Sequence, residues 1–331
     1  MLAPDECRIF DADEAGELAV VLCHFNPLGF ENPERNLART LQWLESERLP
    51  TFAVELACGD GARGTALPDH PRIIHLSART AFFRKENLWN IAARRLPRRY
   101  RYVLCLDADI VLHAPGWKDA LLAELEEHRL VHPFSDAAWL DSTGRVFRRK
   151  TSAVTAFLAG VDAPESGRTY HVGFGVALWR SFWSDTAGLY NGPLGEGASA
   201  LMAAAMNRTA ALAPYFGGIS PEFLDHYRRW AEQISSWTRG KLSYIDAEAR
   251  HFWHGHSAKR KYVWHNPIGD AHFEDRQTWF AGFDPAGDMT LDAQGLLDWT
   301  PAALASKPTM VSGIERYFAE RDEDEWYDSA F

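Results

Sequence analysis

The sequence predicts an α/β protein with a mostly parallel central sheet and helices on both faces. Strand-like and helix-like segments alternate from residue 18 onward, with short connections between them. The strand-like segments are almost continuously apolar, which is typical of strands buried on both faces. Helices that cover both sides of a parallel sheet give this pattern. A chain of 331 residues with 46% hydrophobic side chains is long enough for one large domain of this kind.

Each element is recognised by its periodicity or by the turn residues around it. Four apolar runs predict strands at residues 18–25, 51–60, 72–76 and 101–112. Apolar side chains at helical spacing predict helices at residues 34–49, 85–96 and 116–128. Residues 135–167 are polar and lack a period, so we expect a loop, a hairpin or a flap there. Further on we expect a strand and then a helix at 171–183, a helix from Ser199, and a strand or loop at 244–262.

Net charge and cysteine content narrow the class of protein. The formal net charge of −10 gives no overall attraction to nucleic acid, although basic residues gather at 94–101, 147–150 and 259–261 and could bind a local anion. The four cysteines have no zinc or CxxC spacing, so we expect free thiols in a reducing compartment. The N-terminus lacks a signal-like segment, and no apolar run reaches about 18 residues. We therefore expect a cytoplasmic protein without a membrane span, in a bacterium or a phage-infected host cell.

Two carboxylates, Asp107 and Asp109, stand near the end of the apolar run RYVLCLDADIVL. Burying a carboxylate without a partner costs several kcal/mol. Ligands of parallel α/β sheets bind beyond the carboxyl ends of the strands, where these aspartates are expected. Two hard oxygen ligands at this spacing suit Mg²⁺ or Mn²⁺, which would hold a diphosphate. The structural alternative is a salt bridge to the nearby arginines.

A later segment, HFWHGHSAKRKY, offers histidines to the same site. His254 and His256 lie beside Trp253 and are followed by a basic run with Lys259 and Lys261. An imidazole added to the carboxylates would favour Mn²⁺, and the lysines would suit a diphosphate. The alternative is a surface loop whose histidines hydrogen-bond to the backbone.

Taken together, the motifs resemble those of the GT-A glycosyltransferases. The segments FFRKENLWNIAARRLPRRYRYVLCLDADIVL, HVGFGVALWRSFW and HFWHGHSAKRK are similar, in this order, to the nucleotide-sugar core, the acceptor-side segment and the late histidine motif of that family. The galactosyltransferase-like and family 2-like branches are the most similar. The resemblance spans residues 18–265. It implies a Rossmann-like GT-A domain at 1–265, with a nucleotide half at 18–112 and an acceptor half at 113–265, and a C-terminal extension at 266–331.

The resemblance also assigns roles to single residues. Asp107 and Asp109 would be the DxD pair, with Asp109 the more direct metal ligand, and His254 matches the late histidine, with His256 as its rival. The residues implied at the nucleotide-sugar are Phe25, Asn26, Glu55, Arg84, Lys85, Asn90, Asp107, Lys259 and Lys261. The resemblance further implies Mn²⁺ or Mg²⁺ as the cofactor and a UDP-sugar as the donor.

One segment departs from the family pattern. Family members carry an acidic residue after the acceptor strand, which serves as the catalytic base, whereas GPLGEGASALM has Ala198 at the matching position. Glu196 is then the expected base, because an inverting transfer needs a carboxylate to take the acceptor proton. The alternative is that Glu196 caps the helix expected from Ser199. Without a base, the protein would be slow, would use another base, or would be inactive.

We therefore expect a metal-dependent glycosyltransferase that moves a sugar from a UDP-sugar to an acceptor hydroxyl. The acceptor favoured among specific ones is a 5-hydroxymethyl pyrimidine in DNA, because the chain also resembles the group that glucosylates such bases in phages and in base J synthesis. A polysaccharide or other glycan acceptor is the alternative. A nucleotide-sugar binding protein that has lost catalysis is a second reading, supported by Ala198. A nucleotidyltransferase ranks last, because NPLGFENPE has a single glycine and no phosphate loop.

Overall fold

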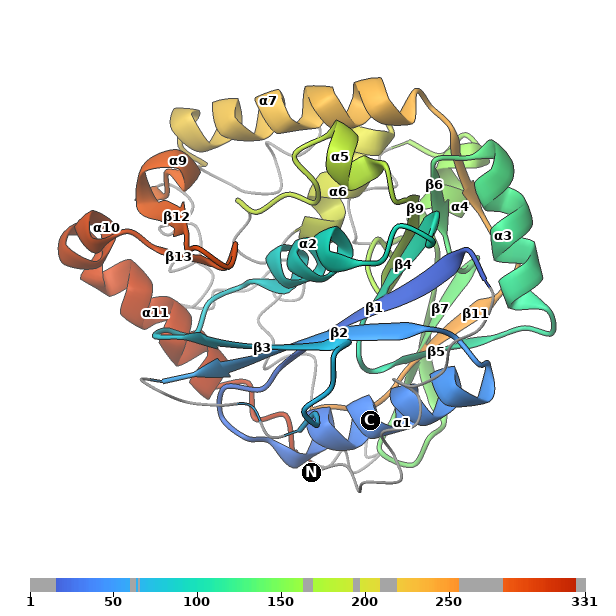
Figure 1. Cartoon of the computed structure of the whole chain (residues 1–331), viewed down its shortest axis with the longest axis horizontal. Coiled ribbons are helices and arrows are strands. Elements are labelled where there is room, and N and C mark those ends of the chain that lie inside the picture. The colour runs from blue at the N-terminus through green and yellow to red at the C-terminus, as the bar shows by residue number, and fades with distance from the viewer. Residues whose placement is uncertain are drawn as a thin grey trace.

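The computed structural model describes residues 16–59, 64, 66–162, 169–192, 197–208, 219–255 and 282–325. These residues form a seven-stranded sheet with helices on both faces, and a smaller four-stranded sheet beside it (Figure 1). The helices are α1 (Glu31–Ser46), α2 (Lys85–Arg95), α3 (Trp117–Glu127), α4 (Ala153–Leu158), α5 (Phe182–Asp185), α6 (Gly197–Ala205), α7 (Pro221–Thr238), α9 (Pro285–Asp288), α10 (Pro301–Ser306) and α11 (Pro308–Ala319). The α/β fold class predicted from the sequence is confirmed.

The central sheet is parallel except for one strand. Its order is β10 (Leu242–Tyr244), β6 (Leu130–His132), β9 (Gly175–Trp179), β4 (Tyr102–Leu106), β1 (Leu18–Phe25), β2 (Thr51–Cys58) and β3 (Ile73–Ala78). Only β9 runs antiparallel to its neighbours. The carboxyl ends of β1, β2 and β4 therefore lie at the same edge of the sheet, which is where ligands of such folds bind.

Two apolar cores lie on opposite faces of this sheet, because alternate residues of a strand point to opposite sides. Val20 and Leu22 of β1 belong to one core, with α1 and α3. Ala19 and Val21 of the same strand belong to the other core, with α2, α6 and α7. Burial on both faces therefore explains why the residues of β1 are almost all apolar.

The strand predicted at 101–112 is two strands in two sheets. β4 ends at Leu106, the chain turns, and β5 (Ile110–His113) begins the smaller sheet. The order of that sheet is β5, β11 (Glu248–His251), β7 (Asp136–Leu140) and β8 (Val146–Thr151). The apolar pattern continues across the turn because β4 is buried on both faces and β5 is buried on one, so the pattern hid the break. Asp107 and Asp109 thus lie where the chain passes from one sheet to the other.

Residues 135–162 are more regular than the sequence predicted. They hold the antiparallel hairpin of β7 and β8, followed by α4. The hairpin alternative is confirmed and the loop alternative is wrong for this part of the chain, while the flap stays a prediction. The period was weak because β8 lies at the edge of the smaller sheet and carries polar side chains on both faces.

Residues 282–325 pack on the face of the central sheet that carries α2. They form α9, the hairpin of β12 (Met289–Leu291) and β13 (Leu297–Trp299), α10 and α11. Ile314 and Phe318 of α11 are buried in the same core as α2. The domain boundary expected near residue 265 lies outside the described residues and stays a prediction.

Two smaller expectations can also be compared with the structure. Among the described residues, no helix combines the length and the apolar character that crossing a membrane requires. Cys23, Cys58 and Cys105 are free thiols, as predicted, while Cys7 lies outside the described residues. Burial raises the pKa of the Cys58 thiol above its ordinary value.

Candidate functional site

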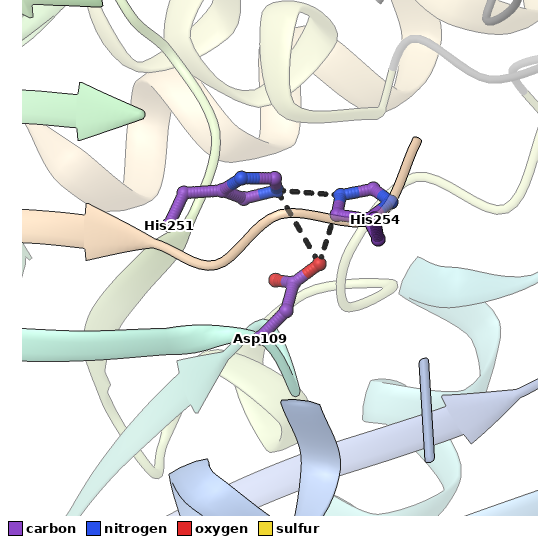
Figure 2. Close-up of side chains that lie close together, drawn as sticks. All are labelled: Asp109, His251 and His254. Atoms are coloured by element: carbon purple, nitrogen blue, oxygen red, sulfur yellow. Dashed lines mark hydrogen bonds and ion pairs between the residues drawn. The ribbon is translucent and has the colours of Figure 1, made fainter. Parts of the chain in front are cut away.

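Three side chains from distant parts of the sequence meet beside the turn after β4. The polar atoms of Asp109, His251 and His254 point toward one another (Figure 2). Asp109 Oδ2 lies 3.3 Å from His251 Nε2 and 3.2 Å from His254 Nε2, and the two Nε2 atoms are 2.7 Å apart. His254 is buried, and the other two residues are half-buried. We call these three residues the Asp-His-His cluster.

Strand pairing in the smaller sheet explains why these residues meet. β11 runs antiparallel to β5 and pairs His251 with Ile110, the residue after Asp109. The Phe252 amide donates to the Asp109 carbonyl at 2.9 Å, one step past the end of the strand. The chain then leaves β11, and Gly255 follows His254 with a φ of 89°, a left-handed conformation that favours glycine.

The cluster has the donor set of a divalent metal site. Two imidazole nitrogens 2.7 Å apart cannot both carry a proton, so either one donates to the other or both lone pairs face a shared cation. One carboxylate with two imidazoles suits Mn²⁺ better than Mg²⁺, which prefers oxygen ligands. All the donor atoms lie within 4.8 Å of one another, as the ligands of one ion must. The residues present therefore fit the metal that the sequence implied, with Mn²⁺ favoured.

Asp107 pairs with a lysine beside the cluster. Lys85 Nζ lies 3.0 Å from Asp107 Oδ1 and 3.3 Å from Oδ2, and the Asp107 amide donates to the Phe174 carbonyl. Burial by itself would lower the pKa of Lys85, but the charges of Asp107 and Glu86 raise it above its ordinary value. The sequence left a salt bridge to arginine as the alternative to a metal, and the partner is a lysine. A role of Asp107 as a metal ligand stays a prediction.

The C-terminal segment brings a further carboxylate to the cluster. Glu323 is buried, and its Oε1 lies 3.7 Å from His254 Nδ1 and 2.5 Å from Arg321. The next residue, Asp324, accepts hydrogen bonds from two backbone amides at the start of α1, which ties the segment down. A carboxylate beside the far nitrogen of a ligating histidine favours the tautomer that leaves Nε2 to the metal. Glu323 is therefore placed to orient His254.

Replacing Glu323 by glutamine should weaken Mn²⁺ binding by roughly tenfold, because partners that orient a metal ligand typically contribute about 10- to 100-fold in affinity. Isothermal titration with Mn²⁺ measures this directly. Glu315→Gln is the matched control, since Glu315 is exposed on α11 and should keep the wild-type affinity. Equal affinities in the two variants would show that Glu323 does not act through His254.

Phe25 ends β1, Asn26 follows it, and Glu55 lies within β2, and all three side chains have contacts within the chain. The Phe25 ring meets the Phe318 ring edge-on at 5.4 Å. The Asn26 side chain closes a turn with the backbone of Phe30. Glu55 is buried and accepts from the Ala66 amide at 2.8 Å. Its Oε2 also lies 3.0 Å from His75 Nδ1. The structure does not bring these three side chains into the Asp-His-His cluster.

Arg84 and Asn90 are buried, and their side chains form hydrogen bonds within the protein. Arg84 donates to the Leu297 carbonyl at 2.6 Å and pairs with Asp298 at 2.8 Å, so it fastens β13 to the start of α2. The amide of Asn90 uses both donors and both acceptor positions in hydrogen bonds within the protein. These bonds join Leu189 N, Leu189 O, Asn191 Oδ1 and Trp183 Nε1. A contact of either residue with the nucleotide stays a prediction.

Four residues expected at the site, Glu196, His256, Lys259 and Lys261, lie outside the described residues. Their roles as catalytic base, metal ligand and diphosphate contacts stay predictions.

A small cavity lies beside the Lys85–Asp107 pair, between α2, the start of β9 and α6. Its described lining is Lys85, Glu86, Trp89, Val172, Gly173, Phe174, Gly175, Val176, Leu189, Gly197, Ala198, Leu201 and Met202. Only Glu86 carries a carboxylate among these residues. Burial raises the pKa of Glu86 above its ordinary value. A Cβ at position 197 would collide with the Glu86 carboxyl group, so a larger residue there would displace the Glu86 side chain.

Sequence reasoning missed His251, Glu323 and Glu86. His251 begins the segment HFWHGHSAKRKY, and its spacing of three residues from His254 could have indicated a shared ligand set. Glu323 lies in an acidic stretch that reads as a solvated surface, so no local signal marks it. Glu86 adjoins Lys85 in a charged helix start, and only packing against α6 distinguishes it.

Comparison with known proteins gives distant structural likenesses. No protein-family model matches the chain, and no curated protein sequence does. The catalytic domain of Drosophila β1,4-galactosyltransferase 7 in complex with xylobiose is 11% identical and has a TM-score of 0.39, with 89% of this chain and 99% of that chain covered. Glucosyl-3-phosphoglycerate synthase from Mycobacterium tuberculosis, in complex with Mn²⁺, UDP and phosphoglyceric acid, is 11% identical, with a TM-score of 0.37 and coverages of 89% and 90%. S. aureus TarS 1–349 is 10% identical, with a TM-score of 0.37 and coverages of 79% and 69%.

Proposed function

We propose that this protein is a metal-dependent glycosyltransferase that moves a sugar from a nucleoside diphosphate-sugar, with UDP as the expected nucleotide, to an acceptor hydroxyl. The observation that supports this best is the meeting of Asp109, His251 and His254 next to the Lys85–Asp107 pair, just past the end of β4. Metal ligands and a lysine ammonium at one strand end suit a diphosphate. The sequence resemblance to GT-A glycosyltransferases supports the same reaction class.

The chain's own residues would bind and orient the donor. When bound, a divalent cation would stabilise the negative charge of the diphosphate as it leaves. Asp109, His251 and His254 would hold that cation, and Glu323 would keep His254 in the required tautomer. Lys85 would place a positive charge beside the phosphate oxygens. Because Asp107 already holds the ammonium, its position is set before the donor binds.

The acceptor hydroxyl must lose a proton, and two carboxylates are candidates for taking it. Glu196 is the residue expected from the sequence. Glu86 is the carboxylate that the cavity contains, and it lies against the start of α6, next to Ala198. Its raised pKa brings the carboxylate toward the range in which it is an effective base at neutral pH. We propose that Glu86 serves as the base if Glu196 does not.

Release of nucleoside diphosphate from a panel of sugar donors tests the proposed reaction. We expect release that requires Mn²⁺, stops with EDTA and rises with a suitable acceptor. Glu86→Gln and Glu196→Gln identify the base, because the variant that lacks it should lose about 100-fold or more in transfer while it still binds the donor. Donor binding without turnover across the panel would favour a binding protein. Release of pyrophosphate when a nucleoside triphosphate and a sugar 1-phosphate replace the donor would favour a nucleotidyltransferase.

The acceptor predicted from the sequence, hydroxymethylated DNA, is proposed alongside a glycan acceptor. The same release assay with hydroxymethylcytosine DNA separates them, because a DNA acceptor should raise release and bind with strong salt dependence. Release that responds to glycans and not to DNA would assign the glycan alternative.

A further inference from the structure

The smaller sheet carries a row of three side chains that leads away from the Asp-His-His cluster. In the registers of the sheet, His251 of β11 pairs with Trp139 of β7, and Trp139 pairs with Arg148 of β8. Directly paired residues lie on the same face of a sheet. The ring contacts agree, since the Trp139 and His251 centroids are 6.4 Å apart and the Arg148 guanidinium lies 5.3 Å from the Trp139 ring. Arg148 is thus joined to the candidate metal centre through one tryptophan.

Lys150 belongs to the same face as Arg148. The two are separated by one residue along β8, so their side chains point to the same side, and Arg149 points to the other. Arg149 pairs with Glu248 at 2.7 Å on that opposite face. Arg148 and Lys150 are half-buried, whereas Arg149 is exposed. Arg148 and Lys150 therefore lie on the face of the sheet that carries His251, and Arg149 lies on the opposite face.

Arg148 and Lys150 are held on one face of β8 and are partly out of water. Burial, with the like charge of Arg148, lowers the pKa of Lys150 to about 8. Charged residues on an edge strand also discourage pairing with other chains, and this structural role needs no ligand. Inward-pointing charges serve this role as outward-facing ones do, but the role does not require the two cations to share a face with Trp139 and His251. A lysine with a perturbed pKa, on one face with a second cation and with a side chain of the candidate site, favours a binding role.

We propose that Arg148 and Lys150 form an acceptor subsite that binds a phosphate group. Trp139 lies between this subsite and His251. This inference deepens the proposed function, because it rests on the transferase reading and names the class of acceptor as one that carries a phosphate. Arg presents a planar fork of donors to phosphate oxygens, and Lys adds a point charge. The Trp139 ring would pack against the part of the acceptor next to the phosphate. The phosphate could belong to a small phosphorylated acceptor or to a nucleic acid strand.

Calorimetry in the presence of EDTA tests the subsite without the metal and without turnover. The probes are glycerol 3-phosphate, glycerol as its uncharged counterpart, and a single-stranded oligothymidylate. We expect at least one phosphate-bearing probe to bind wild type and Arg149→Gln alike. Arg148→Gln and Lys150→Gln should each weaken that binding by roughly tenfold or more, the usual effect of a lost charged hydrogen bond. Lys150→Arg, which keeps the charge, should retain the affinity and shows that the strand is intact.

The two phosphate sources give different results in this experiment. Binding of glycerol 3-phosphate that depends on Arg148 and Lys150 supports a small phosphorylated acceptor, and binding of the oligonucleotide alone, with the same dependence, supports a nucleic acid strand. Equal losses in Arg148→Gln, Lys150→Gln and Arg149→Gln would overturn the proposal, as would the absence of binding by both phosphate-bearing probes. Because no sugar donor is present, failure here leaves the proposed transferase activity untouched.

The affinity for the phosphate probe should also fall between pH 7 and pH 9. Lys150, with a pKa of about 8, loses its proton in this range. Arg148 acts on Lys150 and stays charged, and the pKa of His171 lies well below its ordinary value, so that His171 stays neutral. Phosphate monoesters are dianions throughout, because their second pKa is about 6. Lys150→Arg should lack the decline, and the same decline in that variant would show that Lys150 is not its source.

Discussion

Asparagine in place of Asp109 should weaken Mn²⁺ binding by more than about 100-fold and remove metal-dependent donor turnover. The carboxylate is the one anionic ligand in the Asp-His-His cluster, and both histidine Nε2 atoms lie within 3.3 Å of its Oδ2. Changing a residue that merely orients a metal ligand typically costs about 10- to 100-fold, so loss of the ligand itself should cost more. Isothermal titration with Mn²⁺ measures the affinity of the purified variant.

Thermal unfolding gives a second measurement of the same effect. At a Mn²⁺ concentration of about 100 times the dissociation constant, wild type should gain about 2.7 kcal/mol of stability, and Asp109→Asn should gain almost none. Asp225→Asn is the control, because Asp225 is exposed on α7 and pairs with Arg229 in the same helix. A metal-dependent rise in the unfolding temperature of Asp109→Asn equal to that of the control would refute the assignment of the metal centre.

Alanine in place of Asn90 should destabilise the fold by about 3 kcal/mol or more without changing Mn²⁺ affinity. The change leaves the Leu189 amide, the Leu189 carbonyl and the Trp183 indole without their partner in a fully buried position, and each such group costs about 1 to 3 kcal/mol. In a chain of this size, the midpoint of thermal unfolding should fall by about 4 °C or more.

The Asn90→Ala variant distinguishes a structural role of Asn90 from a contact with the nucleotide. If Asn90 contacts the nucleotide, as the resemblance implies, Asn90→Ala should weaken donor binding while the stability stays near that of wild type. Gln42→Ala, at an exposed position of α1, should stay within about 0.5 kcal/mol of wild type and provides the reference. A stable Asn90→Ala variant that fails to bind the donor would contradict the structural role.

Local sequence patterns predicted most of the strands and helices of the fold. Apolar runs marked β1, β2 and β4, and helical spacing marked α1, α2 and α3, because burial on both faces of a sheet leaves a direct trace in residue types. The turn at 107–109 left no such trace, since β4 and β5 are both apolar. The β7–β8 hairpin was visible only as one of three alternatives, because β8 is an edge strand with a polar surface.

The candidate site, like the fold, was predicted in part from local sequence and decided in part by the tertiary structure. The sequence by itself determined that Asp109 stands at a strand end and that His254 lies in a histidine-rich segment, because both features are local. Only the tertiary structure decided that His251 completes the cluster, that Asp107 pairs with Lys85, and that Asn90 is an internal hydrogen-bond hub. These outcomes depend on strand register and on packing between segments about 20 to more than 140 residues apart. Contacts over such separations are set by the whole fold and leave no pattern in any one stretch of sequence.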